Sequence, residues 1–340
     1  MQSATFNWIQ KHGWSHNPFT FSILPDLFVG YQEQINRLIS AVDEKQKLIL
    51  LIGPTGSGKT TFLRHIETVL DEDFIYLSKP PKSVEDLIWI FNHRYSTGVI
   101  FKDRAKGIHH LTYWLNGKIK RHLVVLVDEA HETNQDILEW FRAISDQIDN
   151  ITIVLSGLPS FEDMLRRKLE TLRARASTKI ELLSLTKDAM TELIRKRIEH
   201  VGGTDQPFIP EVIDYIYERS AGFPREVLRI CDSLINKAAK ANIDLITVEL
   251  LRTDQQEEQK INIEALPDKQ RKILELLIKP STPVELTSAF PEYLTQSAAT
   301  RAINNILNRL AKSGYVERKR QGKTYLYNLA PRVQTIFIKA

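Results

Sequence analysis

The segment Leu48–Thr61 reads LILLIGPTGSGKTT, and it decides the fold of this 340-residue chain. Its first residues are an uninterrupted apolar run, which is typical of a strand buried on both faces of a parallel sheet. A glycine-rich turn follows and leads into a helix, and this turn fills the template G-x-x-x-x-G-K-[ST] from Gly53 to Thr60. In this context the template predicts a loop that binds the phosphates of a nucleoside triphosphate.

Each residue type in this loop serves the binding of phosphate. Glycines lack a Cβ, so the backbone can curl until successive N–H groups converge on phosphate oxygens. We expect Lys59 to bridge the β- and γ-phosphates and Thr60 to bind Mg²⁺. The predicted nucleotide-binding residues of the loop are Gly53, Pro54, Thr55, Gly56, Ser57, Gly58, Lys59, Thr60 and Thr61.

A second apolar run, LVVLVDEA at residues 123–130, ends in the carboxylates of Asp128 and Glu129. A central parallel strand would present both acids at the carboxyl edge of the sheet, beside the phosphate-binding loop. We expect Asp128 to hold Mg²⁺ and Glu129 to polarise an attacking water. The two segments together therefore predict hydrolysis of the bound nucleotide.

Composition and cysteine content narrow the class of protein. Apolar residues make up 42% of the chain, which is typical of a globular protein, and the length predicts two or three domains. The sequence has neither a membrane-spanning apolar window nor the features of a secretory leader. The single cysteine, Cys231, excludes an internal disulfide and a thiolate metal site, and we expect it to fill the core. These features favour a cytoplasmic protein without a membrane partner.

Charge is distributed unevenly along the chain. The formal net charge is +4, but residues 265–340 carry +8 and residues 1–264 carry −4. On a fold that binds nucleic acid, such a local excess is an electrostatic footprint for DNA.

The periodicity of apolar residues predicts alternating strands and helices up to residue 184, and therefore an α/β fold with a parallel sheet between helices. The expected strands are 47–52, 73–77, 122–127, 151–155 and about 178–182. The expected helices are 59–70, 82–95, 103–120, 134–148 and 159–170. Beyond residue 185 the period is helical only, and it predicts a small all-α lid of helices at 187–200, 210–220, 224–240 and 248–255, followed by a charged linker at 254–260.

The last part of the chain has a different plan. Helices are expected at 267–278, 284–290 and 296–313, followed by a hairpin at 315–328 that turns at Gln321-Gly322. Three helices and a basic hairpin predict a winged helix-turn-helix domain. The predicted domains are thus a nucleotide-binding core at 1–184, a lid at 185–258 and a winged helix at 259–340.

The winged helix predicts contact with double-stranded DNA. The third helix would enter the major groove, and the hairpin would contact phosphates or the minor groove. The predicted DNA-binding residues are Gln296, Ser297, Thr300, Arg301 and Asn304 on the helix and Arg318, Lys319, Arg320 and Lys323 on the hairpin. Winged helices also serve as protein-docking modules, so the basic hairpin favours DNA over this alternative.

Together these motifs resemble an AAA+ ATPase of the type found in archaeal origin-recognition initiators. The opening Asn17-Pro18-Phe19 also resembles ExeA-type and transposition-regulator ATPases. The resemblance implies that the nucleotide is ATP and that Val29 and Tyr31 lie in the segment that lines the adenine pocket. Tyr31 stands where this family usually has arginine, so the adenine preference rests on analogy.

The same resemblance extends the predicted catalytic site. Ser156 matches the sensor-1 position, which orients the attacking water, although a turn residue before Gly157 is an equal reading. Arg225 matches sensor 2, which reaches from the lid to the γ-phosphate. Arg175, or else Arg173, matches the arginine finger that acts on the nucleotide of a neighbouring subunit, the alternative being a solvated helix face.

The leading functional hypothesis is a slow ATPase, stimulated by oligomerisation or DNA, whose nucleotide state sets its assembly on duplex DNA. Such a homo-oligomer would serve as an initiator, a loader or a mobile-element helper, with a partner machine such as a helicase or transposase. The alternative is an ATP-sensing transcription regulator with a winged-helix effector. A secretion-type ATPase is a third class, suggested by the Asn-Pro-Phe opening but disfavoured by the winged helix.

Overall fold

The computed structural model divides the chain into two compact units, Met1–Leu250 and Leu251–Ala340. The first unit contains a parallel sheet and a group of helices that follows it, and the second contains a smaller set of helices with a hairpin. The structure describes residues 4–96, 103–204, 206–251, 266–278, 280–291, 293, 295–321 and 324–330.

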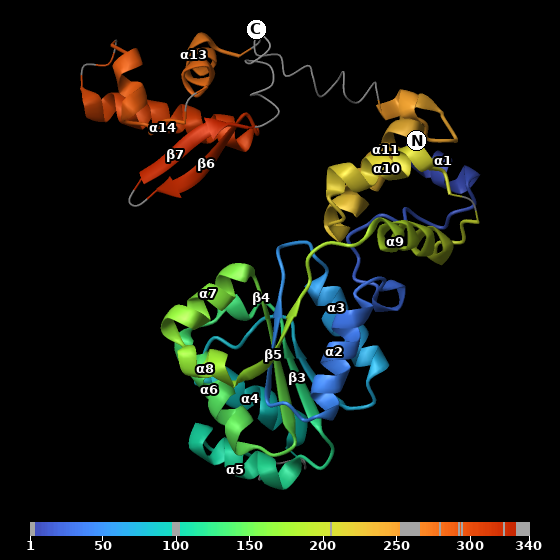
Figure 1. The fold of residues 1–340 in the computed structure, drawn as a ribbon, viewed down its shortest axis with the longest axis vertical. Coiled ribbons are helices and arrows are strands. Elements are labelled where there is room, and N and C mark those ends of the chain that lie inside the picture. The colour runs from blue at the N-terminus through green and yellow to red at the C-terminus, as the bar shows by residue number, and fades with distance from the viewer. Residues whose placement is uncertain are drawn as a thin grey trace. The chain divides into compact units, whose positions relative to one another are not determined.

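The first unit is built on a five-stranded parallel sheet with the strand order β2-β3-β4-β1-β5 (Figure 1). The strands are β1 Leu48–Ile52, β2 Asp73–Leu77, β3 Leu123–Val127, β4 Ile151–Gly157 and β5 Ala176–Glu181. All five lie where the apolar runs predict them, with small shifts at the ends of β4 and β5. The predicted α/β fold with a parallel sheet is therefore confirmed.

Helices cover both faces of this sheet, as Figure 1 shows. Alternate residues of β1 face opposite layers: Leu48 and Leu50 pack in one core, and Ile49 and Leu51 pack in the other. One layer consists of α2 (Gln32–Asp43) and α3 (Lys59–Val69). The opposite layer consists of α4 (Val84–Tyr95), α5 (Ile108–Lys118), α6 (Gln135–Gln147), α7 (Pro159–Lys168) and α8 (Glu170–Arg175).

Local signals set the ends of several helices in the second layer. Ser83 caps α4 in a capping box with Asp86, because each side chain accepts a hydrogen bond from the other's backbone N–H. The helix expected at 103–120 is shorter and begins after Gly107. The helix expected at 159–170 is also shorter and ends at Lys168, where the backbone leaves the helical region at Leu169 before α8 begins.

Three of the four helices expected after the sheet are α9 (Lys187–His200), α10 (Pro210–Ser220) and α11 (Pro224–Ala241). Cys231 is fully buried in α11, as predicted. Residues 248–251 are helical, and the remainder of the helix and the linker expected beyond them lies outside the described residues. None of the described helices is both long and apolar enough to cross a membrane.

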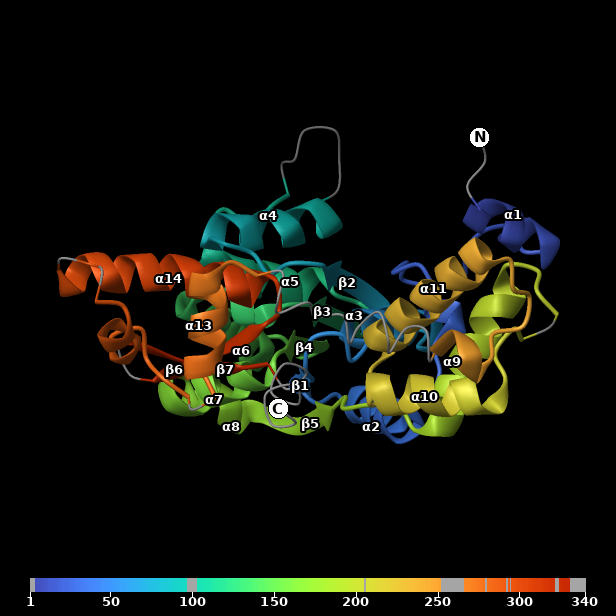
Figure 2. The same ribbon diagram turned by 90° about the horizontal axis from the view of Figure 1, so that it is seen from above.

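No helix is expected from the sequence before residue 32, but the structure has α1 at Ala4–Lys11. Figure 2 shows α1 beside α11, and the two helices are in contact. The indole nitrogen Nε1 of Trp8 donates to the carbonyl of Ile243 at 2.6 Å. The aromatic residues at the start of the chain therefore pack on helices that follow the sheet, although the predicted core includes them.

The second unit has the expected order of elements: α13 (Asp268–Leu276), η4 (Glu285–Ala289), α14 (Gln296–Lys312), β6 (Val316–Gln321) and β7 (Thr324–Leu329). The strands β6 and β7 pair in antiparallel fashion. The helix expected at 284–290 is a shorter 3-10 helix. Ile273, Ile303 and Tyr327 belong to one core that joins the helices to the hairpin. The predicted turn at Gly322 lies outside the described residues.

Candidate functional site

The phosphate-binding loop connects the buried strand β1 to helix α3. Gly56 and Gly58 adopt φ values of +84° and +95°, which side chains rarely allow. A Cβ on Gly56 would lie 3.0 Å from the Cβ of Arg225. Glycine is therefore needed at position 56 both for its backbone conformation and for the close approach of α11.

Lys59 folds back over this loop. Its Nζ donates to the carbonyl oxygens of Gly53 at 2.9 Å and Pro54 at 3.1 Å. Burial lowers the pKa of Lys59, while the nearby carboxylates of Glu129 and Asp128 oppose that shift. The loop thus holds an ammonium group whose donors can pass from loop carbonyls to a phosphate.

Asp128 is the centre of a hydrogen-bond network at the carboxyl edge of the sheet. Its Oδ2 accepts from the hydroxyl groups of Thr60 at 2.6 Å and Tyr76 at 3.3 Å. Its Oδ1 accepts from the hydroxyl of Ser156 at 3.0 Å and from the backbone N–H of Glu129 at 2.9 Å. The predicted residues Asp128, Thr60 and Ser156 therefore meet, and Tyr76 joins them although no motif contains it.

Two observations test whether these residues fit a Mg²⁺–triphosphate. The adjacent oxygens of Thr60 and Asp128 match the preference of Mg²⁺ for oxygen ligands. In the loop, the Ser57 hydroxyl is buried and has no hydrogen-bond partner among the described residues. A buried polar group is normally satisfied, and an anion in the loop would satisfy this one. The donor set fits both groups.

Glu129 follows Asp128 directly in the chain and borders a pocket that the phosphate-binding loop also lines. Its backbone has φ +49°, an uncommon conformation for a residue with a side chain. Its Oε2 lies 3.3 Å from Nδ1 of His131. The predicted water-polarising carboxylate therefore lies at the pocket and beside an imidazole.

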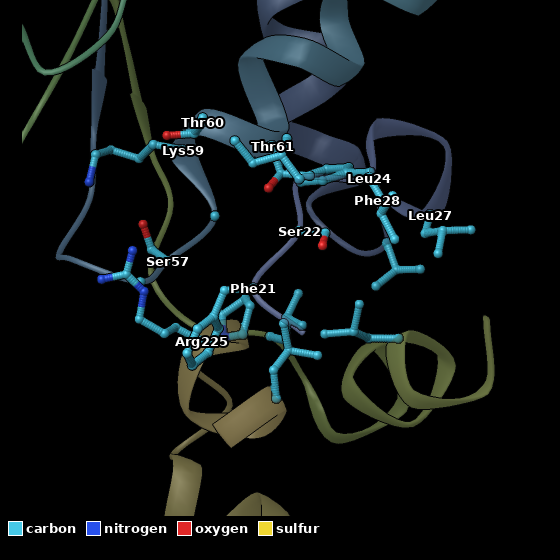
Figure 3. Close-up of a pocket in the computed structure, with 18 of the residues that line it drawn as sticks. Phe21, Ser22, Leu24, Leu27, Phe28, Ser57, Lys59, Thr60, Thr61 and Arg225 are labelled. Carbon is cyan, nitrogen blue, oxygen red and sulfur yellow. The ribbon is translucent and has the colours of Figure 1, made fainter. Parts of the chain in front are cut away.

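A pocket of about 260 Å³ extends from the loop to an apolar wall. Figure 3 shows Leu24 and Phe28 beside Thr61, and Phe21 across the pocket from Lys59 and Thr60. Such a combination of a polar loop and an apolar wall matches the two ends of a nucleotide.

Val29 and Tyr31, predicted near the adenine, both border this pocket. The Tyr31 hydroxyl is within hydrogen-bond distance of the carbonyls of Ser57 at 3.2 Å and Leu183 at 3.3 Å. Burial raises the pKa of Tyr31, so the hydroxyl stays protonated as a donor. Tyr31 therefore links the phosphate-binding loop to the segment that leads into α9.

Arg225 lies in the first turn of α11, and it borders the pocket from that helix. Its backbone N–H donates to the carbonyl of Gly56 at 3.3 Å. Figure 3 shows its side chain near Ser57. The amino end of α11, where the helix dipole is positive, thus contacts the phosphate-binding loop directly.

The two candidate arginine fingers lie elsewhere. Arg173 and Arg175 belong to α8, just before β5, and β5 pairs in parallel with β1 from Leu48 onward. They are therefore near the amino edge of the sheet, opposite the loop, and neither borders the pocket. Arg173 lies 3.7 Å from a Glu162 oxygen, and Arg175 lies 3.6 Å from an Asp146 oxygen. This position leaves both predicted roles open: a finger for another subunit or a solvated helix face.

The predicted DNA-binding residues of α14 line one open groove of about 610 Å³ in the second unit. The groove residues are Val284, Gln296, Ser297, Thr300, Arg301, Asn304 and Asn305. On β6, Arg318, Lys319 and Arg320 are exposed, and the guanidinium of Arg318 lies 5.0 Å from the ring centroid of Tyr325. Lys323 lies outside the described residues.

Tyr76 and Arg197 of the first unit were not predicted from the sequence. Tyr76 could have been found from its position, because it is a polar residue near the end of a strand that lies beside β3. No such signal exists for Arg197, which borders the pocket from α9 and hydrogen-bonds only to main-chain carbonyls among the described residues.

The fold and the site resemble those of P-loop ATPases of the AAA+ type. Residues 42–165 match the family model of the AAA domain, which confirms the resemblance expected from the motifs. The chain is also similar to General secretion pathway protein A of Aeromonas hydrophila, with 27% identity over 239 residues. That alignment covers 66% of this chain but only 43% of the Aeromonas protein, so the chain spans less than half of its relative.

Solved structures share this fold at low sequence identity. The Aeropyrum pernix ORC1 protein in complex with DNA has a TM-score of 0.54 and 15% identity, over 95% of each chain. The Thermotoga maritima RuvB Holliday junction branch migration motor has a TM-score of 0.54 and 20% identity, over 94% of this chain and 98% of RuvB. At these identities the likeness concerns the fold alone.

Proposed function

We propose that this protein is an ATP-dependent, DNA-binding AAA+ ATPase whose nucleotide state controls its assembly on duplex DNA. In this role it acts as an initiator, a loader or a mobile-element helper, with a helicase, a transposase or a similar machine as partner. The observation that carries the proposal is the Asp128 network, which joins Ser156 to Thr60, a residue that lines the pocket together with Lys59 and Arg225.

The residues of this network divide the work of hydrolysis. Lys59 would bind the β- and γ-phosphates, and Thr60 and Asp128 would hold Mg²⁺, which would supply positive charge beside the phosphates. Glu129 accepts a proton from the attacking water, and Ser156 orients that water. Arg225 contacts the γ-phosphate from α11, so loss of this phosphate releases the helix from the loop.

Arg175 and Arg173 lie away from the pocket of their own chain, so a role in hydrolysis would have to be in trans. An arginine supplied to a neighbour's nucleotide stabilises charge in the transition state, so hydrolysis would be slow until subunits assemble. Mixing Lys59→Ala with Arg175→Ala subunits should then restore part of the activity that each variant lacks alone. Absence of rescue would favour the solvated helix face.

The DNA part of the proposal rests on the second unit, which we interpret as a winged helix. Its groove presents amide, hydroxyl and guanidinium groups from α14, which are the groups that read base edges. The exposed cations of β6 suit contact with phosphates. The positive balance of residues 265–340 and the fold shared with a DNA-bound ORC1 support the same conclusion.

Two substitutions test the ATPase assignment. Lys59→Ala should abolish ATP binding, whereas Glu129→Gln should bind ATP and stop hydrolysis. Glu132→Gln is the matched control, because it makes the same change at an exposed carboxylate three residues away. Normal turnover in Glu129→Gln would contradict the role of Glu129 in activating water.

The particle mass of the Glu129→Gln protein tests the assembly. With ATP and duplex DNA we expect a multi-subunit particle, and a single-subunit mass under all conditions would contradict nucleotide-controlled assembly. An ATP-sensing transcription regulator would instead show ATP-dependent affinity for one DNA site without assembly.

The similarity to General secretion pathway protein A favours one further candidate, an ATPase that serves a secretion pathway. This candidate requires ATP binding but not DNA binding. Unchanged electrophoretic mobility of duplex DNA at low salt, together with intact ATP binding, would favour it over the leading proposal.

A further inference from the structure

The segment before the core is attached to the helices that follow the sheet. The side chain of Asn17 donates to Oδ1 of Asp232 on α11 at 2.6 Å. The Phe19 ring packs between Trp14 and Phe208, with ring centroids 6.5 and 5.9 Å apart. Residues 14–19 therefore belong structurally to the group α9–α11, although more than 150 residues separate them from it.

Arg197 of α9 holds the next part of this segment through its backbone. Its Nη1 donates to the carbonyls of Thr20 at 2.9 Å and Pro18 at 3.3 Å, and its Nη2 donates to the carbonyl of Ser22 at 2.9 Å. The residue is 6% exposed. One guanidinium thus fixes three alternate carbonyls of residues 18–22 to α9.

Arg197, which we call the clamp because it binds these three carbonyls, carries a positive charge that no carboxylate of the described residues balances. Within the described ranges no carboxylate forms an ion pair with Arg197, and its Nε has no acceptor. A buried cation without a counter-ion costs free energy. For the same reason, burial lowers the pKa of Arg197. A site that keeps such a cation beside a ligand pocket points to a functional role rather than to stability.

The chain passes to the core directly after the carbonyls that this clamp binds. The carbonyl of Pro25 lies 3.0 Å from Nδ1 of His65 on α3, and the Phe28 ring packs on Phe62 with centroids 5.7 Å apart. Between these two attachments Phe21 and Ile23 border the pocket, and they are 63% and 50% exposed. Figure 3 shows Phe21 on the side of the pocket opposite Lys59 and Thr60.

We propose that Arg197 is a positioning residue for the base of the bound nucleotide. By clamping residues 18–22 to α9, it holds Phe21 and Ile23 as the base-side wall of the pocket, and this wall moves with α9–α11 rather than with the sheet. Exposed aromatic and branched side chains at a pocket suit the flat apolar faces of a purine. The inference rests on the proposed nucleotide site and adds the residues that build its other end.

Binding of two different ligands distinguishes the contributions of the two ends of the pocket. ATP occupies both ends, whereas inorganic tripolyphosphate occupies only the phosphate-binding loop. Arg197→Lys keeps the charge but cannot span three carbonyls, and Arg197→Met removes the charge. In both variants we expect the Kd for ATP to rise about tenfold or more, since hydrogen bonds from a charged group are lost, while the Kd for tripolyphosphate stays within about twofold. Arg195→Met on the same helix is the control, because Arg195 is exposed and pairs with Glu192 and Glu199.

Each outcome of this titration supports or overturns the proposed role of Arg197. An unchanged Kd for ATP, or an equal rise for ATP and tripolyphosphate, overturns the role of Arg197. A wild-type protein that binds neither ligand refutes the proposed nucleotide site itself, and the inference falls with it. Phe21→Ala is measured in parallel because this exposed residue can change without loss of the fold, which thermal unfolding verifies. It should show the same selective loss of ATP affinity, and unchanged ATP affinity overturns the proposed wall even if the Arg197 variants fail to fold.

Discussion

Replacement of Tyr76 by phenylalanine tests how much the Asp128 network stabilises the protein. The lost hydroxyl donates at 3.3 Å to a carboxylate that is 2% exposed. A hydrogen bond to a charged group contributes about 1.5–3 kcal/mol, and the long distance places this bond at the lower limit or just below it. Three other donors remain on Asp128. We therefore expect the free energy of unfolding to fall by about 1–1.5 kcal/mol.

The Tyr76→Phe change leaves the rest of the side chain in place. The guanidinium of Arg64 lies 3.5 Å from the centre of the Tyr76 ring, and phenylalanine retains this cation–π contact. Burial, followed by the charge of Asp128, raises the pKa of Tyr76 to about 12. The hydroxyl consequently remains a donor, and the expected loss should be the same at pH 7 and pH 9.

The chain offers a matched control in Tyr95→Phe. The Tyr95 hydroxyl on α4 is also buried, but it has no hydrogen-bond partner in the part of the chain that the structure describes. Its removal should leave stability unchanged or slightly higher. Urea unfolding of both variants measures the difference, with equal m-values as the condition for comparison. A Tyr76→Phe midpoint equal to that of the wild type, or equal losses in both variants, would refute the reasoning.

Three further changes test other parts of the molecule. Gly56→Ala places a side chain on a residue whose φ is +84°, which should cost roughly 1–2 kcal/mol and weaken ATP binding about 5- to 30-fold. Gly117→Ala on the open surface of α5 is the control and should only raise Tm. Equal ATP affinity in the two variants would contradict this reasoning. Glu162→Gln removes a carboxylate that accepts from Lys179 at 2.8 Å, a hydrogen bond that lowers the pKa of Glu162. Because the folded pKa of Glu162 lies below the unfolded value of about 4.3, this stabilisation is present above pH 4.3 and is lost as pH falls through the folded pKa. The wild type should therefore lose its stability advantage over the variant in acid unfolding titrations. A constant difference in stability between the two proteins across that pH range would contradict this prediction. Reversal of the three exposed cations of β6 to glutamate should flatten the salt dependence of DNA binding, and an unchanged slope would exclude β6 as a phosphate contact.

The strands and the phosphate-binding loop could be predicted because their signals are local. Each central strand is a continuous apolar run, and burial on both faces requires such a run regardless of what lies around it. The loop between β1 and α3 is specified by glycine conformation and by the residues that bind phosphate. The order of these elements then places Asp128 beside Thr60, since the carboxyl ends of parallel strands share one edge.

The elements that the sequence did not predict depend on distant partners. Helix α1 has eight residues, too few to be stable alone, and it forms because Trp8 and Ile9 are buried in the first unit. The break between α7 and α8 lies at Leu169, which is apolar and carries no glycine or proline signal. Tertiary contacts therefore decide both features.

Two site residues were missed for a related reason. Tyr76 reaches Asp128 only because β2 pairs with β3 in the register Leu77 to Val127, and a single strand does not reveal its neighbour. Arg197 binds main-chain carbonyls, which every residue has, so no sequence pattern at positions 18–22 marks them as its partners.

The contact between α1 and α11 has a consequence for the synthesis of the protein. Thr5 donates a hydrogen bond to Asn236, which lies 231 residues later in the chain. At about 5–20 residues per second, a ribosome needs roughly 10 to 50 s to cover that distance. During this time the nascent chain carries Trp8 and Ile9 without their final cover, while the sheet can already form from residues 48–181. Translation therefore completes the catalytic core before the group of helices that closes its pocket.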